Sequence, residues 1–380
     1  MLSKISFLSI AFRPFFILAA LIATINPALW ASNLLKGFDL PLYVSPLFWH
    51  GHEMLFGYTS ALVAGFILTA SANWTGTTPY KGKPLLLLSS LWIVERLIYL
   101  FDCRPLTTLI LSHTFYPTLI LLLFLKVKNH HKQRNVFIPL LTLIFISSLS
   151  HSYGYLFSME SFETLGLRSG VSLITLLLFL ILGRVLPFFT RSKTGIEIAI
   201  PASAHKFSLV PLALLCLPIQ SQLFLTVMLT VAFMANSYRN FLMFRKEVIK
   251  IPMLLVLHVG LFFLTFSLLV NLLSIYFPDI NDNREILHLT MVGGLGLISL
   301  GIMTRVSLGH TGRIIKASKM TVVAYLSIFI AAILRSFVPY FFPDFYDNGI
   351  YIASKFWALG FILFLFIFGK ALFTPRPDGK

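Results

Sequence analysis

The chain has 380 residues, of which 57% are hydrophobic and only 12% are charged, and its formal net charge is +16. A soluble protein carries about 25% charged residues, so this composition excludes an ordinary soluble domain and predicts the lipid bilayer as the main partner. The positive charge does not indicate nucleic acid, because the basic residues lie in short loops between apolar runs.

The first apolar run follows Lys4 and resembles a secretory signal peptide, with Ala28 and Ala31 where cleavage would occur. Arg13-Pro14 interrupts this run early, which favours an uncleaved first membrane span. The two cysteines, Cys103 and Cys216, have neither metal-ligand nor disulfide spacing.

A series of apolar stretches follows, each with the length of a membrane-spanning helix, which needs about 20 mostly apolar residues to cross about 30 Å of hydrocarbon. No long hydrophilic segment separates them, so the sequence predicts an all-α polytopic helical bundle that forms a single transmembrane domain over residues 1–380. In chain order the predicted spans are 13–32, 49–71, 84–101, 105–125, 136–157, 167–189, 252–277, 285–306, 320–341 and 349–372.

The stretch 207–238 is longer and contains a polar break at Pro218-Ile219-Gln220-Ser221-Gln222. It is one long helix, a hairpin of two short passes, or a re-entrant hairpin. Lys and Arg concentrate in cytoplasmic loops, and the basic loops of this chain stay on one side only if 207–238 crosses an even number of times. That alternation predicts about twelve spans, with both termini in the cytoplasm.

Two of the predicted spans share a weak internal echo, for which duplication and chance are both open explanations. His50…Met54…Gly57…Trp74-Thr75-Gly76 is echoed by His288…Met291…Gly293…His310-Thr311-Gly312. Both stretches begin with His at the predicted outer face and end with Thr-Gly at the inner face.

The densest group of polar residues at membrane depth is Trp49-His50-Gly51-His52-Glu53-Met54. Ionisable residues inside a span are costly, so they mark a site or a satisfied pair. His50 and Glu53 share a helical face, whereas His52 points elsewhere unless the helix begins there. Imidazole is a common metal ligand and a carboxylate can orient it. We expect His50, His52 or both to bind a metal or haem iron, with Glu53 as orienting group or proton carrier; a polar helix cap is the alternative.

The predicted topology places other histidines in two layers. His113, His151 and His288 join the outer layer, and His258 and His310 lie near the inner face. For each of these histidines the alternative is a purely structural role, such as a hydrogen bond between His113 or His151 and a neighbouring hydroxyl. His288 opens a glycine-rich helix that a second helix or a flat ring could approach closely. The histidines expected to bind metal are His50, His52, His151 and His288, and those expected to contact a cofactor also include His113, His258 and His310.

Three arginines complete the candidate site. Arg96 lies at nearly the same predicted depth as Glu53 on the next span. We therefore expect Arg96 to pair with Glu53 or to bind an anionic group such as a haem propionate; a pair with Glu95 or an outward orientation is the alternative. Arg305 and Arg313, in Met303-Thr304-Arg305-Val306-Ser307-Leu308-Gly309-His310-Thr311-Gly312-Arg313, form a second candidate anion cradle, or are simply the basic residues of an inner helix end.

Several segments, in order along the chain, resemble signatures of the NnrS family. They are Phe12-Arg13-Pro14-Phe15-Phe16, His50-Gly51-His52-Glu53-Met54-Leu55-Phe56-Gly57-Tyr58, Ala64-Gly65-Phe66-Ile67-Leu68-Thr69-Ala70, Asn73-Trp74-Thr75-Gly76, Gly183-Arg184-Val185-Leu186-Pro187-Phe188-Phe189-Thr190 and Leu308-Gly309-His310-Thr311-Gly312-Arg313. The resemblance implies a bacterial inner-membrane protein that contains haem b and copper and is linked to nitric oxide metabolism, denitrification and nitrosative stress.

The leading hypothesis for function is a haem and copper protein that binds, turns over or detoxifies nitric oxide, and whether it is an enzyme stays open. The outer histidines would ligate iron and copper, because imidazole suits both metals and no thiolate is placed to do so. Turnover would require an electron donor as a partner and proton carriers, for which Glu53 and Asp102 are candidates. The rival hypothesis is a secondary transporter of a small anion or metal species that uses intramembrane His, Arg and Glu.

Overall fold

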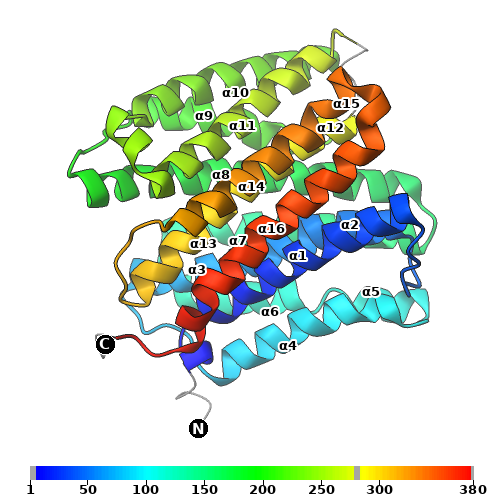
Figure 1. Ribbon diagram of the computed structural model, residues 1–380, viewed down its shortest axis with the longest axis horizontal. Helices are drawn as coiled ribbons and strands as arrows, with labels where there is room; N and C mark the ends of the chain where they lie inside the picture. The colour runs from blue at the N-terminus through cyan, green and yellow to red at the C-terminus, as the bar shows by residue number, and fades with distance from the viewer. Residues whose placement is uncertain (1–5, 278–282, 378–380) are drawn as a thin grey trace. The chain divides into compact units, whose positions relative to one another are not determined.

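The computed structural model describes residues 6–277 and 283–377, and these residues form helices and no strand (Figure 1). Lys4, which precedes the first apolar run, lies outside the described residues. Within them, nine helical segments are long and apolar enough to cross a membrane. These segments are Phe12–Lys36, Pro46–Thr75, Pro105–Val127, His131–Leu156, Glu160–Thr194, Pro252–Ser274, Glu285–His310, Lys319–Phe341 and Pro343–Phe373. The prediction of an all-α, multi-pass membrane protein is confirmed at this level.

One predicted span is shorter in the structure than the sequence suggested. The stretch 84–101 forms α4 (Lys83–Leu97) and a 3-10 turn, η4 (Ile98–Leu100). The α-helical part has 15 residues, fewer than the roughly 20 needed to cross the hydrocarbon layer unaided.

The long stretch 207–238 is a hairpin of two helices rather than one continuous helix. α9 (Ala202–Leu214) and α10 (Gln222–Met243) lie side by side (Figure 1). The polar break separates them, and the Ser221 side chain caps α10 by accepting a hydrogen bond from the Phe224 backbone N–H at 3.4 Å. A capping serine satisfies a backbone donor that the first turn of a helix leaves open.

The chain packs into two compact units. Among the described residues, the first contains 6–170, 306–315 and 361–377, and the second contains 171–277, 283–305 and 316–360. Three long helices contribute residues to both units: α8 (Glu160–Thr194), α13 (Leu297–His310) and α16 (Tyr346–Phe373).

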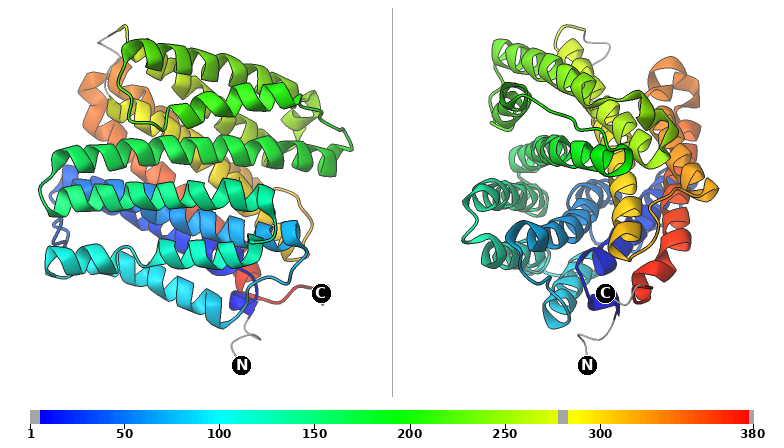
Figure 2. Two further views of the ribbon diagram at one scale, coloured as in Figure 1. Left: turned by 180° about the vertical axis from the view of Figure 1, so that it is seen from behind. Right: turned by 90° about the vertical axis from the view of Figure 1, so that its left-hand side faces the viewer.

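The first unit is built around α1 (Phe12–Lys36) and α3 (Thr59–Thr75), which pack against each other. Their approach is close because α3 carries Gly65, where a Cβ would lie only 2.9 Å from the Phe16 ring. α6 (Phe115–Val127) and α7 (His131–Leu156) lie side by side in the same unit (Figure 2). The shorter helices are η2 (Ser6–Leu8), α2 (Pro46–His52) and α5 (Pro105–Leu111).

The second unit packs α11 (Pro252–Ser274) and α14 (Lys319–Ser336) against the segment that runs from α12 (Asn283–His288) into α13. Glycines let these helices approach: a Cβ at Gly293 would collide with the Phe263 ring. Glu285 and Arg335 form a buried ion pair in this unit. The short elements are η5 (Lys246–Lys250), α15 (Val338–Phe341) and η8 (Pro343–Phe345).

Two spans share an uncommon local structure. The span 46–75 changes from α-helix to π-helix directly after His52, at η3 (Glu53–Tyr58), and the span 285–310 does so directly after His288, at η7 (Leu289–Gly296). A glycine with positive φ follows each span: Gly76 (φ 63°) directly after Thr75, and Gly312 (φ 70°) two residues after His310. These are the two stretches of the internal echo, which therefore share local backbone geometry as well as sequence.

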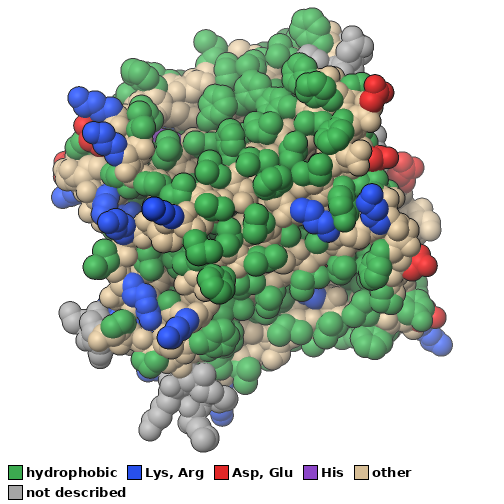
Figure 3. All heavy atoms as spheres, in the orientation of Figure 1, with side chains coloured by type: hydrophobic (Ala, Val, Ile, Leu, Met, Phe, Trp, Pro, Cys, Tyr) green, Lys and Arg blue, Asp and Glu red, His purple; other side chains and the backbone are tan. Residues whose placement is uncertain are grey.

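The outer surface of the helices is apolar, as a protein surrounded by lipid requires. Figure 3 shows one face, on which hydrophobic side chains make up most of the surface. Among the described residues, large apolar side chains with more than half of their surface exposed occur in both units, including Leu47, Phe241 and Phe366. A water-soluble protein rarely exposes so many large apolar side chains.

Candidate functional site

The candidate site begins where α2 meets the π-helix η3. Ser45 caps α2, its hydroxyl accepting from the Phe48 N–H at 3.2 Å, and Pro46 occupies the first turn. A π-helix closes its hydrogen bonds over five residues rather than four, so its turn is wider than an α-turn and shifts the direction of the side chains. His52 and Glu53, consecutive residues at this junction, are both 0% exposed, while His50 is half-buried.

His52, Glu53 and Arg96 form a chain of polar contacts inside the first unit. His52 Nδ1 lies 3.0 Å from Glu53 Oε1, and Glu53 Oε2 lies 2.6 Å from Arg96 Nε. The ion pair expected between Glu53 and Arg96 is therefore present. The sequence argument had grouped His50 with Glu53 on an α-helical face; in the structure the histidine in contact with Glu53 is its chain neighbour His52, and His50 Nδ1 contacts Asn26.

Arg96 also contacts Glu95, so it holds two buried carboxylates. Arg96 Nη2 lies 3.3 Å from Glu95 Oε2, and Glu95 Oε1 accepts a hydrogen bond from the Phe115 backbone N–H at 2.7 Å. The Trp92 indole, one turn earlier on α4, donates to the Gly57 carbonyl of the π-helix at 3.1 Å. These contacts fix α4 against η3 and α6.

Three histidines from separate elements meet beside this ion pair. His52 comes from α2, His113 from the turn between α5 and α6, and His151 from α7. The His52 ring centroid lies 6.1 Å from that of His113 and 6.3 Å from that of His151. All three side chains are buried, with at most 6% of their surface exposed.

Hydrogen bonds assign the same tautomer to each imidazole. An oxygen that can only accept faces each Nδ1: the Glu53 carboxylate faces His52, the Leu109 carbonyl is 2.9 Å from His113, and the Glu163 carbonyl is 3.1 Å from His151. Each Nδ1 therefore donates, and each Nε2 keeps its lone pair. A metal-bound histidine has this arrangement, since an oxygen on the second nitrogen orients the ring.

The Nε2 atoms differ in their partners. The Ser148 hydroxyl lies 3.3 Å from His113 Nε2, and the Tyr99 hydroxyl lies 3.5 Å from His52 Nε2. His151 Nε2 is buried and has no hydrogen-bond partner in the described part of the chain. A buried acceptor without a partner is costly, so His151 Nε2 is the atom of the cluster with most to gain from a ligand.

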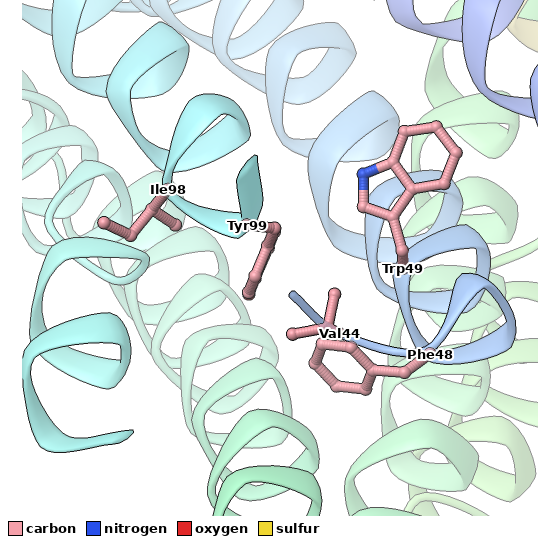
Figure 4. Close-up of a cluster of buried hydrophobic side chains, with 5 residues drawn as sticks. All are labelled: Val44, Phe48, Trp49, Ile98 and Tyr99. Atoms are coloured by element: carbon pink, nitrogen blue, oxygen red, sulfur yellow. The ribbon is translucent and has the colours of Figure 1, made fainter. Parts of the chain in front are cut away.

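Aromatic side chains enclose the three imidazoles. Phe48 stacks on His52 and His151, with centroid distances of 5.7 and 5.0 Å, and Phe56 lies 5.6 Å from His52. Tyr99 of η4 faces Phe48 edge-on, within the buried cluster Val44, Phe48, Trp49, Ile98 and Tyr99 (Figure 4). The three imidazoles are therefore packed among aromatic side chains.

The cluster is compact but is not arranged as a ready metal site. Across residues 6–277 and 283–377, no group of three or more His, Cys, Asp or Glu side chains has the arrangement needed to hold a metal ion. Metal–imidazole bonds are about 2.0 Å long, so the nitrogens of two imidazoles on one ion lie within about 4 Å of each other. The three rings would have to turn inward to share an ion. The donor set nevertheless suits copper, which imidazole binds well.

His50 belongs to the first unit but not to the cluster. Its Nδ1 lies 2.7 Å from Asn26 Oδ1, and its ring stacks on Trp30 with a centroid distance of 4.4 Å. His310 also lies in the first unit, 5.6 Å from the Phe12 ring, and Arg313 donates to the Thr374 hydroxyl at 3.1 Å.

The remaining predicted residues lie in the second unit. His288 is the last residue of α12, and His258 on α11 packs edge-on against Phe244 at 5.6 Å. Its Nε2 is buried and has no hydrogen-bond partner among the residues that the structure describes. Arg305 is buried, with its guanidinium 4.2 Å from the Phe189 ring centroid.

Sequence reasoning missed several members of the site. Tyr99, Ser148 and Phe48 contact the histidines, yet each looks like an ordinary core residue in sequence. Tyr99 follows Arg96 by nearly one helical turn, which is the only signal that could have marked it. The Glu163 carbonyl has no sequence signal at all, because a backbone oxygen is present at every residue.

The fold and the buried polar cluster together define a multi-pass α-helical membrane protein with a histidine–carboxylate–arginine site. The family model described as NnrS protein matches residues 6–376. The chain belongs to the NnrS family. No sequence among the curated proteins compared is similar enough to count as a match.

Proposed function

We propose that the protein binds nitric oxide and takes part in its turnover or detoxification, using copper held by His52, His113 and His151. The observation that carries the proposal is the shared tautomer of these buried imidazoles, each with Nδ1 bound to oxygen and Nε2 left as a potential ligand. Membership of the NnrS family supports the link to nitric oxide.

The donor set fits copper in three respects. Imidazoles suit copper. Oxygens hold the Nδ1 atoms, and His151 Nε2 is a buried acceptor awaiting a partner. Copper bound there would supply a one-electron redox centre and a ligand position for nitric oxide.

The protein residues around the cluster would orient and protect that centre. Glu53 holds the His52 ring through Nδ1, and Arg96 in turn holds Glu53. Phe48 and Phe56 exclude water, which suits a small apolar gas that reaches the site through lipid. Glu53 is also the nearest carboxyl group that could hold a proton during turnover.

We also propose that the protein binds haem b, through residues other than the three clustered histidines. The closely packed Phe48 and Phe56 rings leave the histidine cluster better suited to an ion than to a flat macrocycle. Within the described residues His258 Nε2 is buried and has no hydrogen-bond partner, so His258 would be a candidate to ligate the haem iron. His50, His288 and His310 are further candidates, with Arg305 or Arg313 for the propionates.

We place the protein in the bacterial inner membrane with both termini in the cytoplasm. If α4, α9 and α10 cross the membrane in addition to the nine long apolar segments, the chain has about twelve spans, and the alternation of basic loops supports that number. Cysteine labelling tests this: loops 33–48 and 277–284 should both react from the periplasmic side.

The experiment that tests the function uses the full chain purified in detergent. We expect bound copper, a haem Soret band, and spectral shifts on adding dithionite and then nitric oxide. His151→Ala should lose copper, whereas the matched variant His50→Ala should retain it. Wild-type copper content in His52→Ala, His113→Ala and His151→Ala would overturn the copper site, and a colourless, metal-free preparation would favour a transporter instead.

A further inference from the structure

Three arginines of the first unit converge where α1 begins and where α13 and α16 end (Figure 1 and Figure 2). Arg13, the second residue of α1, is 3% exposed. Its Nη1 donates to the carbonyls of Leu372, at 3.0 Å, and Thr374, at 2.7 Å, in the last turn of α16 and just beyond it. The buried charge of Arg13 is therefore held by neutral oxygens at the end of a helix.

Arg313 and Arg376 bring two more positive charges to the same place. Arg313 Nη2 donates to the Thr374 hydroxyl at 3.1 Å. Arg376 Nη1 donates to the carbonyl of His310, the last residue of α13, at 3.4 Å. The charges of Arg313 and Arg376 both act on Arg13. Arg13, Arg313 and Arg376 thus form a compact group of like charges, which we call the arginine triad.

The charges of the triad call for an anion. Each hydrogen bond described above ends on a neutral oxygen, and neither Arg13 nor Arg313 forms an ion pair with a carboxylate in residues 6–277 or 283–377. Asp378 lies outside the described residues. A guanidinium stays protonated in proteins, so the repulsion between these groups cannot be relieved by loss of a proton. An anion at the triad would offset that repulsion.

The surface beside the triad is apolar. Ile314, next to Arg313, is 85% exposed, and Phe373 is 56% exposed. The Phe7 ring stacks on Phe373 with a centroid distance of 4.7 Å. Arg313 and Arg376 are half-buried, so part of each side chain reaches the surface, where a ligand approaches from outside the helices. Basic side chains grouped at the ends of membrane helices are the usual binding sites for anionic lipid headgroups.

We propose that the arginine triad binds the phosphate of an anionic phospholipid whose acyl chains lie against Ile314 and Phe373. Arginine binds phosphate through charge-assisted hydrogen bonds. A zwitterionic headgroup carries its own cation, so the triad favours a lipid with a net negative charge. Free phosphate has no acyl chains for the apolar surface to contact. Assigning Arg313 to the lipid leaves Arg305 as the candidate for the haem propionates.

The test titrates lipid into the full-length protein in detergent, with dioleoylphosphatidylglycerol as the probe and dioleoylphosphatidylcholine as the reference. Native mass spectrometry measures bound lipid, and thermal unfolding measures the Tm. We expect phosphatidylglycerol to bind more tightly than phosphatidylcholine and to raise the Tm of the wild type further. Sodium phosphate at the same phosphate concentration should leave the Tm unchanged. A rise in Tm with sodium phosphate equal to that with phosphatidylglycerol would assign the triad to free phosphate and overturn the proposal.

Substitutions separate the triad from general positive charge. Arg313→Gln should weaken phosphatidylglycerol binding about fivefold, and Arg313→Gln combined with Arg376→Gln about 25-fold. The matched control is Arg104→Gln, which removes the same charge from an exposed arginine at the start of α5 and should bind within about twofold of the wild type. All these variants retain Arg13, whose hydrogen bonds tie α1 to α16.

Two results would contradict a lipid site at the triad. One is wild-type affinity for phosphatidylglycerol in the double variant, and the other is equal affinity of the wild type for the two lipids. Neither measurement depends on copper, haem or nitric oxide, so the result is independent of the proposed function.

Discussion

Glu53 and Arg96 form an ion pair, 2.6 Å from Oε2 to Nε, in which the glutamate side chain has no exposed surface. The pair links two roles, because Glu53 also holds the His52 ring and Arg96 also holds Glu95, which accepts the Phe115 N–H. The helix contacts of α4 and the orientation of a candidate metal ligand therefore depend on the same two charges.

Removing one partner of this pair should destabilise the protein strongly. Glu53→Ala leaves Arg96 with Glu95 as its one acidic contact among the described residues, and breaking a buried pair costs about 3–5 kcal/mol. The matched control is Arg191→Ala, which breaks a pair with Glu197 whose side chains are 67% and 71% exposed, a loss of about 0–1 kcal/mol. Thermal unfolding in detergent measures both, and equal shifts in Tm for the two variants would contradict the buried pair.

A milder change at the same position should affect the metal more than the fold. Glu53→Gln keeps an oxygen for His52 Nδ1 but removes the negative charge, and loss of such an orienting carboxylate typically lowers metal affinity about 10- to 100-fold. Competition titration with a copper chelator measures the affinity. Glu95→Gln is the control, because in the described part of the chain Glu95 contacts Arg96 and the Phe115 N–H rather than a histidine; a larger effect at Glu95 would argue against the role of Glu53.

The crossing of α7 and α8 should tolerate no side chain at Gly154. A Cβ there would collide with the backbone of Glu163, whose carbonyl accepts the His151 Nδ1 hydrogen bond. Overpacking of this kind typically costs about 1–3 kcal/mol. We expect Gly154→Ala to lower both the Tm and the copper occupancy. Gly369→Ala, where a Cβ meets nothing within 4 Å, should change neither quantity.

His50 and His52 should differ in function. His52 lies in the cluster, whereas His50 bonds Asn26 and stacks on Trp30. Copper per protein, measured by elemental analysis, should fall in His52→Ala and persist in His50→Ala. The reverse pattern would place the metal on the Trp30 side of α2.

Much of the fold could be predicted because a helix that crosses lipid requires a long, mostly apolar stretch of sequence. Each of the nine long apolar segments overlaps a predicted span, and the polar break at 218–222 correctly indicated a hairpin. The length of α4 could not be read in this way, since the apolar run continues past Leu97 although the α-helix ends there.

The site was less predictable for a geometric reason. Helical spacing of 3.6 residues per turn put His50 and Glu53 on one face. In the structure Glu53 contacts its neighbour His52 and Arg96, and the π-helix that starts at Glu53 widens the turn after this position. Nothing in the composition of Glu53–Tyr58 marks that start. Depth in the membrane nevertheless predicted the Glu53–Arg96 pair, because depth depends on residue count from the span boundary more than on rotation around the axis.

The π-helix at Glu53–Tyr58 also makes the interior of the first unit sensitive to length as well as chemistry. A π-turn amounts to an α-helix with one residue inserted, and each residue of an α-helix turns the chain by about 100°. Loss of a single codon between Glu53 and Tyr58 would therefore rotate α2 by about that angle and carry His52 away from His113 and His151, although every side chain named in the cluster would still be encoded.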